Sequence, residues 1–323
     1  MKLNQSQFGY PLEFIWSAYI LQIADFYIAT FNFFSPSVHL QHNVPLPFSP
    51  NHPPPLFYNP FLYSICLLAR VLGPDRSPEW LKAWSVWNGV EQNGTWRDVN
   101  AHEAKHGSRS PCPGLNALAN HGIINASGRD LSFHQLAAAL SRTYNISPTF
   151  SVRALLGATT LWEGRKTINL SDLCAHGLIE HDGSLLRPDV NSGDNKKANQ
   201  SHPYPDLIEK FFPAGNIPVK PRDLSRALTI RRMECAAKNP AYYRSFKFDL
   251  IGSENCAILL AVTGGNRDVI RKFAGIDGIE RFDAYWRPAT RQAFGLTMVD
   301  AQFLLGWIEL GTGSSIKPKI RQI

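Results

Sequence analysis

Charge is scarce in this chain of 323 residues, because Asp, Glu, Lys and Arg together account for only 18% of it. In typical soluble domains, these four residue types make up roughly 25% of the chain. The net charge is +7 at neutral pH, yet the Lys and Arg side chains form no continuous basic block. Zinc-finger spacings, RNA-binding signatures and basic recognition helices are missing as well. We therefore expect no nucleic-acid partner.

Paired cysteines are also missing from the sequence. The chain has five cysteines, an odd number, and no two of them are arranged as CxxC. A disulfide framework or a structural zinc site is therefore not expected. We interpret Cys66, Cys174, Cys235 and Cys256 as small core residues, whereas Cys112 stands in a distinctive setting.

Alternation of apolar and polar residues, the pattern of half-buried strands, is rare. After about residue 100 the apolar residues recur at helical spacing, in segments separated by Gly, Pro and Asn. Hydrophobic residues make up 44% of the chain, enough for a sizeable core. The sequence therefore predicts a mainly α fold. Helices are expected over residues 116–121, 133–142, 151–162, 224–237, 253–262 and 297–310.

The first part of the chain differs from the rest in composition. Residues 1–74 contain only four charged side chains and ten of the 23 prolines. Proline disfavours helix over residues 36–60, where we expect an extended linker. A short helix is expected over 61–72, and the three tryptophans of residues 80–87 share one helix face. The predicted divisions are an apolar, Pro-rich extension over 1–100, a main helical domain over 101–310 and a tail over 311–323.

Residues 10–34 form an almost entirely apolar and aromatic run that includes two acids, Glu13 and Asp25. A secretory signal peptide would have a clean apolar centre and a cleavage site, and neither is present. Three interpretations stay open: a helix packed on the main domain, an anchor in the membrane interface, or a membrane span, which Asp25 makes costly. We favour an intracellular, membrane-associated protein over a secreted one.

The first candidate for chemistry is Cys112, in the sequence Ser-Pro-Cys-Pro-Gly. Pro111 favours an extended approach, and Pro113 suits the first position of a helix, where its missing N–H would have no partner anyway. Cys112 is thus expected at a helix N-terminus, where free N–H groups stabilise a thiolate and lower its pKa. Such a thiolate is a nucleophile or a metal ligand, and the alternative is an inert buried thiol.

The second candidate is the segment Glu-His-Asp-Gly-Ser. Glu180 and Ser184 offer hard oxygen ligands for a small divalent cation such as magnesium. Asp182 is positioned in sequence to orient the imidazole of His181. A solvated loop is the alternative interpretation of this segment.

Taken together, these motifs resemble those of the fungal haem-thiolate peroxidases, which include chloroperoxidase and the unspecific peroxygenases. The resemblance covers roughly residues 100–300, and the apolar front end is similar to that of a branch found with fungal secondary metabolism. A family segment near the C-terminus is altered here over 278–288. The segments that carry the resemblance are PCPGLNALANHGII (111–124), HGLIEHDGSL (176–185), DLSRALTIRRMECAAKNP (223–240) and GSENCAILLAVTGG (252–265).

The resemblance implies a chloroperoxidase-like helical domain around a haem b. The thiolate of Cys112 would be the axial ligand of the haem iron. Glu180, Ser184 and the backbone carbonyl of His181 would hold a magnesium or manganese ion against a haem propionate.

It also implies catalytic residues on the opposite side of the haem. Glu254 would transfer the proton of hydrogen peroxide, and the His181 side chain, hydrogen-bonded to Asp182, would stand beside the reacting oxygen. The expected reaction is oxygenation, or halogenation, of a medium-sized apolar metabolite. The alternative function is a membrane-associated haem-binding or scaffold protein that does not turn over peroxide.

The remaining polar residues of these segments receive structural interpretations. His121 is expected to cap a helix or lie in the core. The arginines of residues 222–232 are expected on a solvated helix face, and the alternative is that one of them pairs with a haem propionate.

Overall fold

A computed structural model of the chain describes residues 12–34, 95–191, 197–290, 292 and 295–312. The linker expected over 36–60, the helix expected over 61–72 and the tryptophans of residues 80–87 lie outside this part of the chain.

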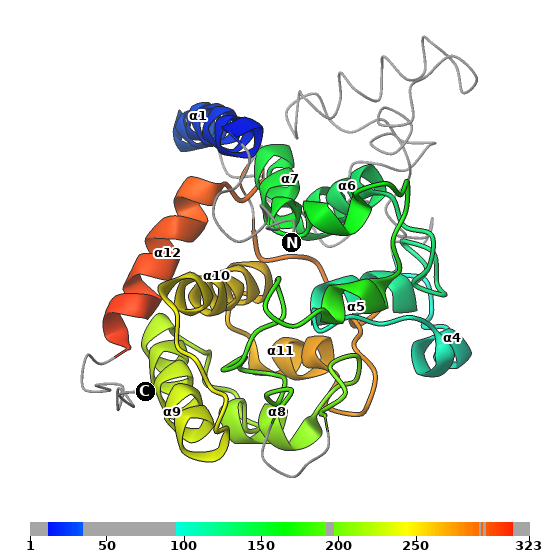
Figure 1. The fold of residues 1–323 in the computed structure, drawn as a ribbon, viewed down its shortest axis with the longest axis vertical. Helices are drawn as coiled ribbons and strands as arrows, with labels where there is room; N and C mark the ends of the chain where they lie inside the picture. Colours follow the sequence, from blue (N-terminus) through cyan, green and yellow to red (C-terminus); the bar gives the residue numbers. More distant parts are fainter. Residues whose placement is uncertain (1–11, 35–94, 192–196, 291, 293–294, 313–323) are drawn as a thin grey trace, which may run out of the picture.

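Helices dominate the described residues, and strands are reduced there to isolated bridges, of which Leu131 with Ile168 is one. The prediction of a mainly α fold is confirmed (Figure 1). The α-helices are α1 (Leu12–Phe34), α4 (Ala101–His106), α5 (Pro113–Asn120), α6 (Phe133–Tyr144), α7 (Pro148–Leu156), α8 (Pro205–Phe211), α9 (Pro221–Lys238), α10 (Phe246–Thr263), α11 (Arg267–Ala274) and α12 (Met298–Gly311). Two 3₁₀ helices are η2 (Thr159–Trp162) and η3 (Leu170–Cys174).

Local capping sets where several of these helices begin. The Ser132 hydroxyl accepts from the N–H of Gln135, whose side chain accepts from the N–H of Ser132, and this reciprocal pair starts α6. Thr297 and Asp300 start α12 in the same way. The predicted helix over 151–162 is corrected, because α7 ends at Leu156 and a separate 3₁₀ turn follows.

Three described helices were not expected from the sequence: α4, α8 and α11. Each has eight residues or fewer, so an apolar period can hardly establish itself within them. α11 is also rich in charge, and its side that packs into the core consists of Ile270 and Phe273. Tertiary packing stabilises such short helices more than their own propensity does.

α10 is the central helix, packed against α12, α9 and α11, while α6 packs against α7 (Figure 1). The buried residues of α10 include Ala257, Leu259 and Val262. They form one continuous hydrophobic core with the buried residues of α5 and α6. This core fixes the position of α10, which carries Glu254, and of α5, which begins directly after Cys112.

The apolar run over 10–34 forms α1, which packs on α7 and α12. Asp25, in the middle of this helix, is fully buried. One carboxylate oxygen accepts from the hydroxyls of Ser147 at 2.8 Å and Thr149 at 2.6 Å, and the other accepts from the N–H of Val299 at 3.2 Å. Asp25 therefore joins the N-terminal ends of α7 and α12, where helix dipoles favour a negative charge.

This contact supports the first of the three interpretations of residues 10–34, a helix packed on the main domain. Among the residues that the structure describes, no helix has the length and apolarity needed to cross a membrane.

We predict that Asp25→Ala lowers the free energy of unfolding by about 1–3 kcal/mol, because the buried Ser147 hydroxyl and two half-buried donors, the Thr149 hydroxyl and the Val299 N–H, lose their acceptor. Denaturant unfolding measures the change. Gln22→Ala, which removes a weak exposed bond between α1 and α12, serves as the control, with an expected change below about 0.5 kcal/mol. Equal stability of Asp25→Ala and the parent chain would contradict the prediction.

Candidate haem-thiolate site

The Cys112 residue forms the N-cap of α5, in extended backbone conformation, and Pro113 occupies the first helical position. This is the placement that the two flanking prolines predict. The N–H groups of Gly114 and Leu115 interact with the sulfur without closing a full capping hydrogen bond. Cys112 is exposed, whereas every residue of α5 from Gly114 onward is buried. The sulfur is therefore accessible at the end of a rigid, buried helix.

The pKa of the Cys112 thiol is raised, whereas the sequence predicts that it is lowered. Although Cys112 is an exposed residue, many protein atoms surround its sulfur, and the resulting desolvation raises the thiol pKa by more than the Leu115 and Gly114 N–H groups and the charge of Arg187 lower it. The N–H groups of the helix N-terminus do lower the thiol pKa, as predicted. The overall pKa is nevertheless raised, so the prediction of a lowered pKa is wrong. A bound metal ion would deprotonate the thiol directly.

Hydrogen bonds hold the loop that presents Cys112. The Asn116 side chain accepts from the N–H of Ser110 and donates to its carbonyl, both at 2.8 Å. The Ser110 hydroxyl in turn accepts from the N–H of Cys112 at 3.2 Å. On the other side of α5, the Tyr144 hydroxyl donates to the carbonyl of Gly114 at 2.7 Å. The position of the sulfur is thus set by α5 and α6 together.

A buried ion pair joins this loop to the Glu-His-Asp-Gly-Ser segment. Arg187, three residues after Ser184, donates to Glu280 Oε1 at 2.7 Å, and both side chains are at most 4% exposed. Asn116 donates to the same oxygen at 3.0 Å. The two motifs found in the sequence therefore meet at Glu280.

Sequence reasoning did not single out Arg187, Asn116 or Glu280. The available signals were the nearness of Arg187 to Ser184 and the presence of Glu280 in the altered segment over 278–288. Neither signal says that these residues meet, since they come from three distant parts of the chain.

The expected ligands of a divalent cation are only partly brought together. Ser184 donates its hydroxyl to the carbonyl of His181 at 3.0 Å, so two of the three groups are neighbours. Glu180 Oε2 lies 2.6 Å from Nδ1 of His176, while Glu180 Oε1 is buried and lacks a hydrogen-bond partner. Within the described ranges, no cluster of three or more His, Cys, Asp or Glu side chains suits a metal ion.

The prediction of a hydrogen bond between Asp182 and His181 is wrong. His181 donates from Nδ1 to the carbonyl of Ile179 at 2.9 Å, and Asp182 accepts from Asn239 at 2.9 Å. The chain forms a turn over residues 177–179, which places the carbonyl of Ile179 within hydrogen-bond distance of the His181 imidazole. Burial lowers the pKa of His181 and raises the pKa of Asp182.

The face of α9 that meets this loop is also not the solvated one expected. Arg231 and Arg232 are buried, and Arg231 donates to Ser184 O at 2.9 Å and to Asp189 at 2.8 Å. Arg232 pairs with Glu309 of α12 at 2.9 Å. Only the outer residues of the expected basic face, Arg222 and Arg226, are exposed. Arg231 therefore holds the loop against α9, while Arg232 connects α9 to α12.

Glu254 is half-buried on α10, and among the described residues no hydrogen bond or ion pair engages its carboxylate. Burial raises its pKa, and the charge of Arg153 acts in the opposite direction. His181 stacks on Phe248 with ring centroids 5.2 Å apart and faces Gly252. Because residues two apart on a helix point to opposite sides, Glu254 and His181 lie on different faces of α10.

The smaller expectations can also be checked against the structure. His121 is buried as the C-cap of α5, where Nδ1 donates to Arg97 O and Nε2 accepts from Phe282 N. Its interpretation as a capping and core residue is confirmed. Cys235 and Cys256 are buried, as expected, while Cys174 is half-buried. Cys66 lies outside the described residues.

A family described as "Peroxidase, family 2" matches residues 99–291 of the chain. The matched range contains the Cys112 helix, the Glu180–Ser184 loop, α10 and Glu280. The chain belongs to this peroxidase family.

Individual members of the family are similar over shorter stretches. A chloroperoxidase of Leptoxyphium fumago is 38% identical over 93 residues, which cover 27% of this chain and 25% of the relative. A dothistromin biosynthesis peroxidase of Dothistroma septosporum is 28% identical over 171 residues, 47% of this chain and 40% of the relative. An aromatic peroxygenase of Cyclocybe aegerita is 34% identical over 115 residues, 29% and 30% respectively. The matches thus span less than half the length of these relatives.

The residues present fit the haem of this peroxidase family at the proposed thiolate position. Cys112 offers an accessible sulfur on a rigid helix end, with N–H groups directed at it. The residue to either side of Cys112 is a proline, which has no backbone N–H, so the N–H groups directed at the sulfur come from Gly114 and Leu115.

The buried ion pair leads to a prediction about the peroxidase fold. Glu280→Leu leaves the Arg187 guanidinium buried and unpaired, so we expect a loss of about 3–5 kcal/mol in unfolding free energy. The double variant Arg187→Met/Glu280→Leu should recover part of that loss. Asp283→Ala, which breaks the exposed pair with Lys272, is the control, with an expected loss of at most about 1 kcal/mol. A Glu280→Leu loss no larger than that of the control would be the contrary result.

Proposed function

We propose that the protein is a haem-thiolate peroxygenase or peroxidase that uses hydrogen peroxide to oxidise a medium-sized apolar metabolite. The observation that carries this proposal is the accessible Cys112 sulfur at the start of α5, within the range matched by the peroxidase family. The names of the similar proteins, a chloroperoxidase and an aromatic peroxygenase, support oxygen insertion and halide oxidation as the candidate reactions.

Cys112 would ligate the iron of a haem b. When bound, the haem would supply the thiolate-ligated iron at which the O–O bond of hydrogen peroxide is cleaved. The chain's own contribution on this side is electrostatic and positional. Arg187 favours the thiolate form, and Asn116 keeps the loop in place whether or not the thiol is charged.

Glu254 is the proposed acid–base residue. Its carboxylate would take a proton from one oxygen of hydrogen peroxide and return it to the other oxygen, so that water leaves. A half-buried carboxylate without a hydrogen-bonding partner in the described chain suits this role, because burial raises its pKa toward neutral values. His181, which faces a different side of α10, and Asp182 next to it in the sequence would be the alternative proton-transfer residues, with His181 positioned by its bond to Ile179.

We also propose that a magnesium or manganese ion binds at the loop of residues 180–184. The support is Glu180 Oε1, a buried carboxylate oxygen without a partner, together with the adjacent Ser184 hydroxyl and His181 carbonyl. Carboxylate and carbonyl oxygens are the ligands these cations prefer.

Two further parts of the proposal concern context. The catalytic unit is the helical domain over 101–310, and its place in fungal secondary metabolism is supported by the likeness to a dothistromin biosynthesis peroxidase. The protein would be intracellular and associated with a membrane through residues 10–34. The exposed aromatic and aliphatic side chains of α1 support this association.

Cys112→Ala tests the haem-thiolate assignment. We expect it to lose, together with activity, the strongly red-shifted Soret band that the reduced, carbon-monoxide-bound parent protein should display. Cys174→Ala, which removes a half-buried thiol near the same loop, is the matched control and should keep the band. A red-shifted band in Cys112→Ala would end the assignment.

Glu254→Gln tests the proton transfer. The carboxamide keeps the shape of the side chain but cannot accept and return the proton, so peroxide turnover should slow by about 10²–10⁴-fold. Stopped-flow rates normalised to haem content separate this from a loss of folded protein. Asn255→Asp, one position away on the exposed side of α10, is the control. A parent-like rate in Glu254→Gln would reassign the proton transfer to His181.

A further inference from the structure

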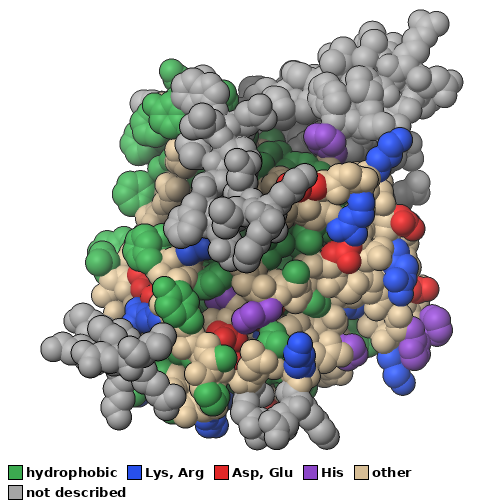
Figure 2. Space-filling model, viewed as in Figure 1, with side chains coloured by type: hydrophobic (Ala, Val, Ile, Leu, Met, Phe, Trp, Pro, Cys, Tyr) green, Lys and Arg blue, Asp and Glu red, His purple; other side chains and the backbone are tan. Residues whose placement is uncertain are grey.

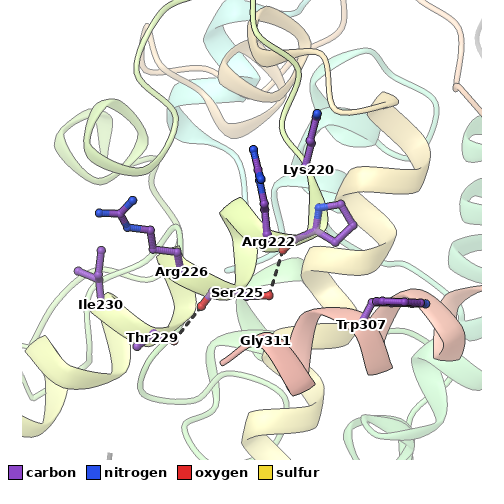
Figure 3. Close-up of a pocket in the computed structure, with 9 residues that line it drawn as sticks. Lys220, Arg222, Ser225, Arg226, Thr229, Ile230, Trp307 and Gly311 are labelled. Carbon is purple, nitrogen blue, oxygen red and sulfur yellow. Dashed lines mark hydrogen bonds between the residues drawn. The ribbon is translucent and has the colours of Figure 1, made fainter. Parts of the chain in front are cut away.

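A groove of about 730 Å³ lies between α9 and α12, and Cys112 is not among the residues that line it (Figure 3). Lys220, Arg222 and Arg226 lie along one side of it, and Ile230 and Trp307 supply apolar surface. None of the described residues that line the groove is acidic. It is therefore a surface with three positive charges beside an apolar patch.

The three cations have no partner among the described residues. Lys220, Arg222 and Arg226 are exposed, and their side chains form no ion pair or hydrogen bond there. The two arginines that follow on the same helix, Arg231 and Arg232, are buried and paired with carboxylates. α9 thus uses its inner arginines for structure and leaves its outer cations available for a ligand with negative charge.

An apolar stripe adjoins the groove. Phe303, Trp307 and Leu310 of α12 are 69%, 74% and 89% exposed and are spaced four and three residues apart, so they share one helix face. Trp307 belongs both to this stripe and to the groove. Large apolar side chains exposed in a row on a helix are unusual for a face that meets only water.

The stripe continues onto the neighbouring helix. α1 packs beside α12, and Gln22 and Gln302 face each other between them. Apart from Thr30, the exposed side chains of α1 are apolar or aromatic, and Asp25, the charged residue among its described side chains, is turned inward and buried. Figure 2 shows apolar side chains gathered along this side of the molecule. The exposed members on α1 are Tyr19, Ile20, Ile23, Phe26, Tyr27 and Phe33.

We propose that the α1–α12 face lies on a lipid bilayer and that Lys220, Arg222 and Arg226 bind the headgroups of anionic phospholipids at its edge. Apolar and aromatic side chains enter the headgroup region, while Lys and Arg beside them pair with phosphate and carboxylate groups. The sequence after α12 adds Lys317, Lys319 and Arg321 and no acidic residue. The inference rests on the proposed membrane association and names the lipid charge that it requires.

The choice of an anionic bilayer follows from the distribution of charge. A zwitterionic surface would be matched by the apolar face alone and would leave three exposed cations without a function. Each Lys or Arg near an anionic bilayer raises affinity roughly fivefold. The attraction weakens as salt is added, because the charges are screened.

Vesicle sedimentation with the full, haem-loaded chain tests the proposal. We expect binding to vesicles of phosphatidylcholine with phosphatidylserine to exceed binding to pure phosphatidylcholine, and to fall with added salt. Arg222→Gln/Arg226→Gln should weaken binding to the anionic vesicles by roughly 30-fold. Lys105→Gln/Arg129→Gln removes the same charge from exposed residues elsewhere, on α4 and in the loop before α6, and should bind like the parent chain.

Each other outcome overturns the lipid-charge inference in a distinguishable way. Equal binding to both vesicle types would leave the membrane association standing and remove the role of the α9 cations. Equal weakening by the two double variants would mean that net charge, and not the groove, attracts the chain. A dimer that ignores vesicles would mean that a second copy covers the face. The haem-thiolate spectrum reports on the proposed enzymatic function independently of all three.

Discussion

A single buried oxygen, Glu280 Oε1, connects the two segments that form the candidate site. It accepts from Arg187, which follows the Glu180–Ser184 loop, and from Asn116, which holds the loop of Cys112. A buried carboxylate is costly unless charge and hydrogen bonds compensate it, and here both partners do so. Because Asn116 lies in one motif and Arg187 directly follows the other, these two bonds connect both parts of the candidate site.

The rest of the interior repeats this arrangement. Asp25 joins the starts of α7 and α12, and Arg232 pairs with Glu309 between α9 and α12. A chain with few charges thus places several of them in the interior, where the low dielectric makes each one specific for its partner. The helices around α10 are aligned by these polar contacts as well as by the apolar core. Glu254, which is half-buried and has no such partner among the described residues, differs from these side chains.

The surface shows the complementary pattern. Apolar side chains such as Phe26 and Trp307 are exposed on neighbouring helices, with the unpaired cations of α9 at their edge. An enzyme that oxidises an apolar metabolite gains from a position at a membrane, because such substrates concentrate there. The proposed activity and the proposed membrane face are therefore compatible, although they involve different parts of the molecule.

The sequence by itself determined the fold class, the long helices and the position of Cys112 at a helix start, since helical periods and flanking prolines act over a few residues. It also supplied the family. Only the tertiary structure decided that Arg231 is buried, that Asp182 bonds to Asn239 and not to His181, and that the thiol pKa is raised. These properties depend on which distant groups surround a side chain and how much water they exclude. Local patterns carry no information about either.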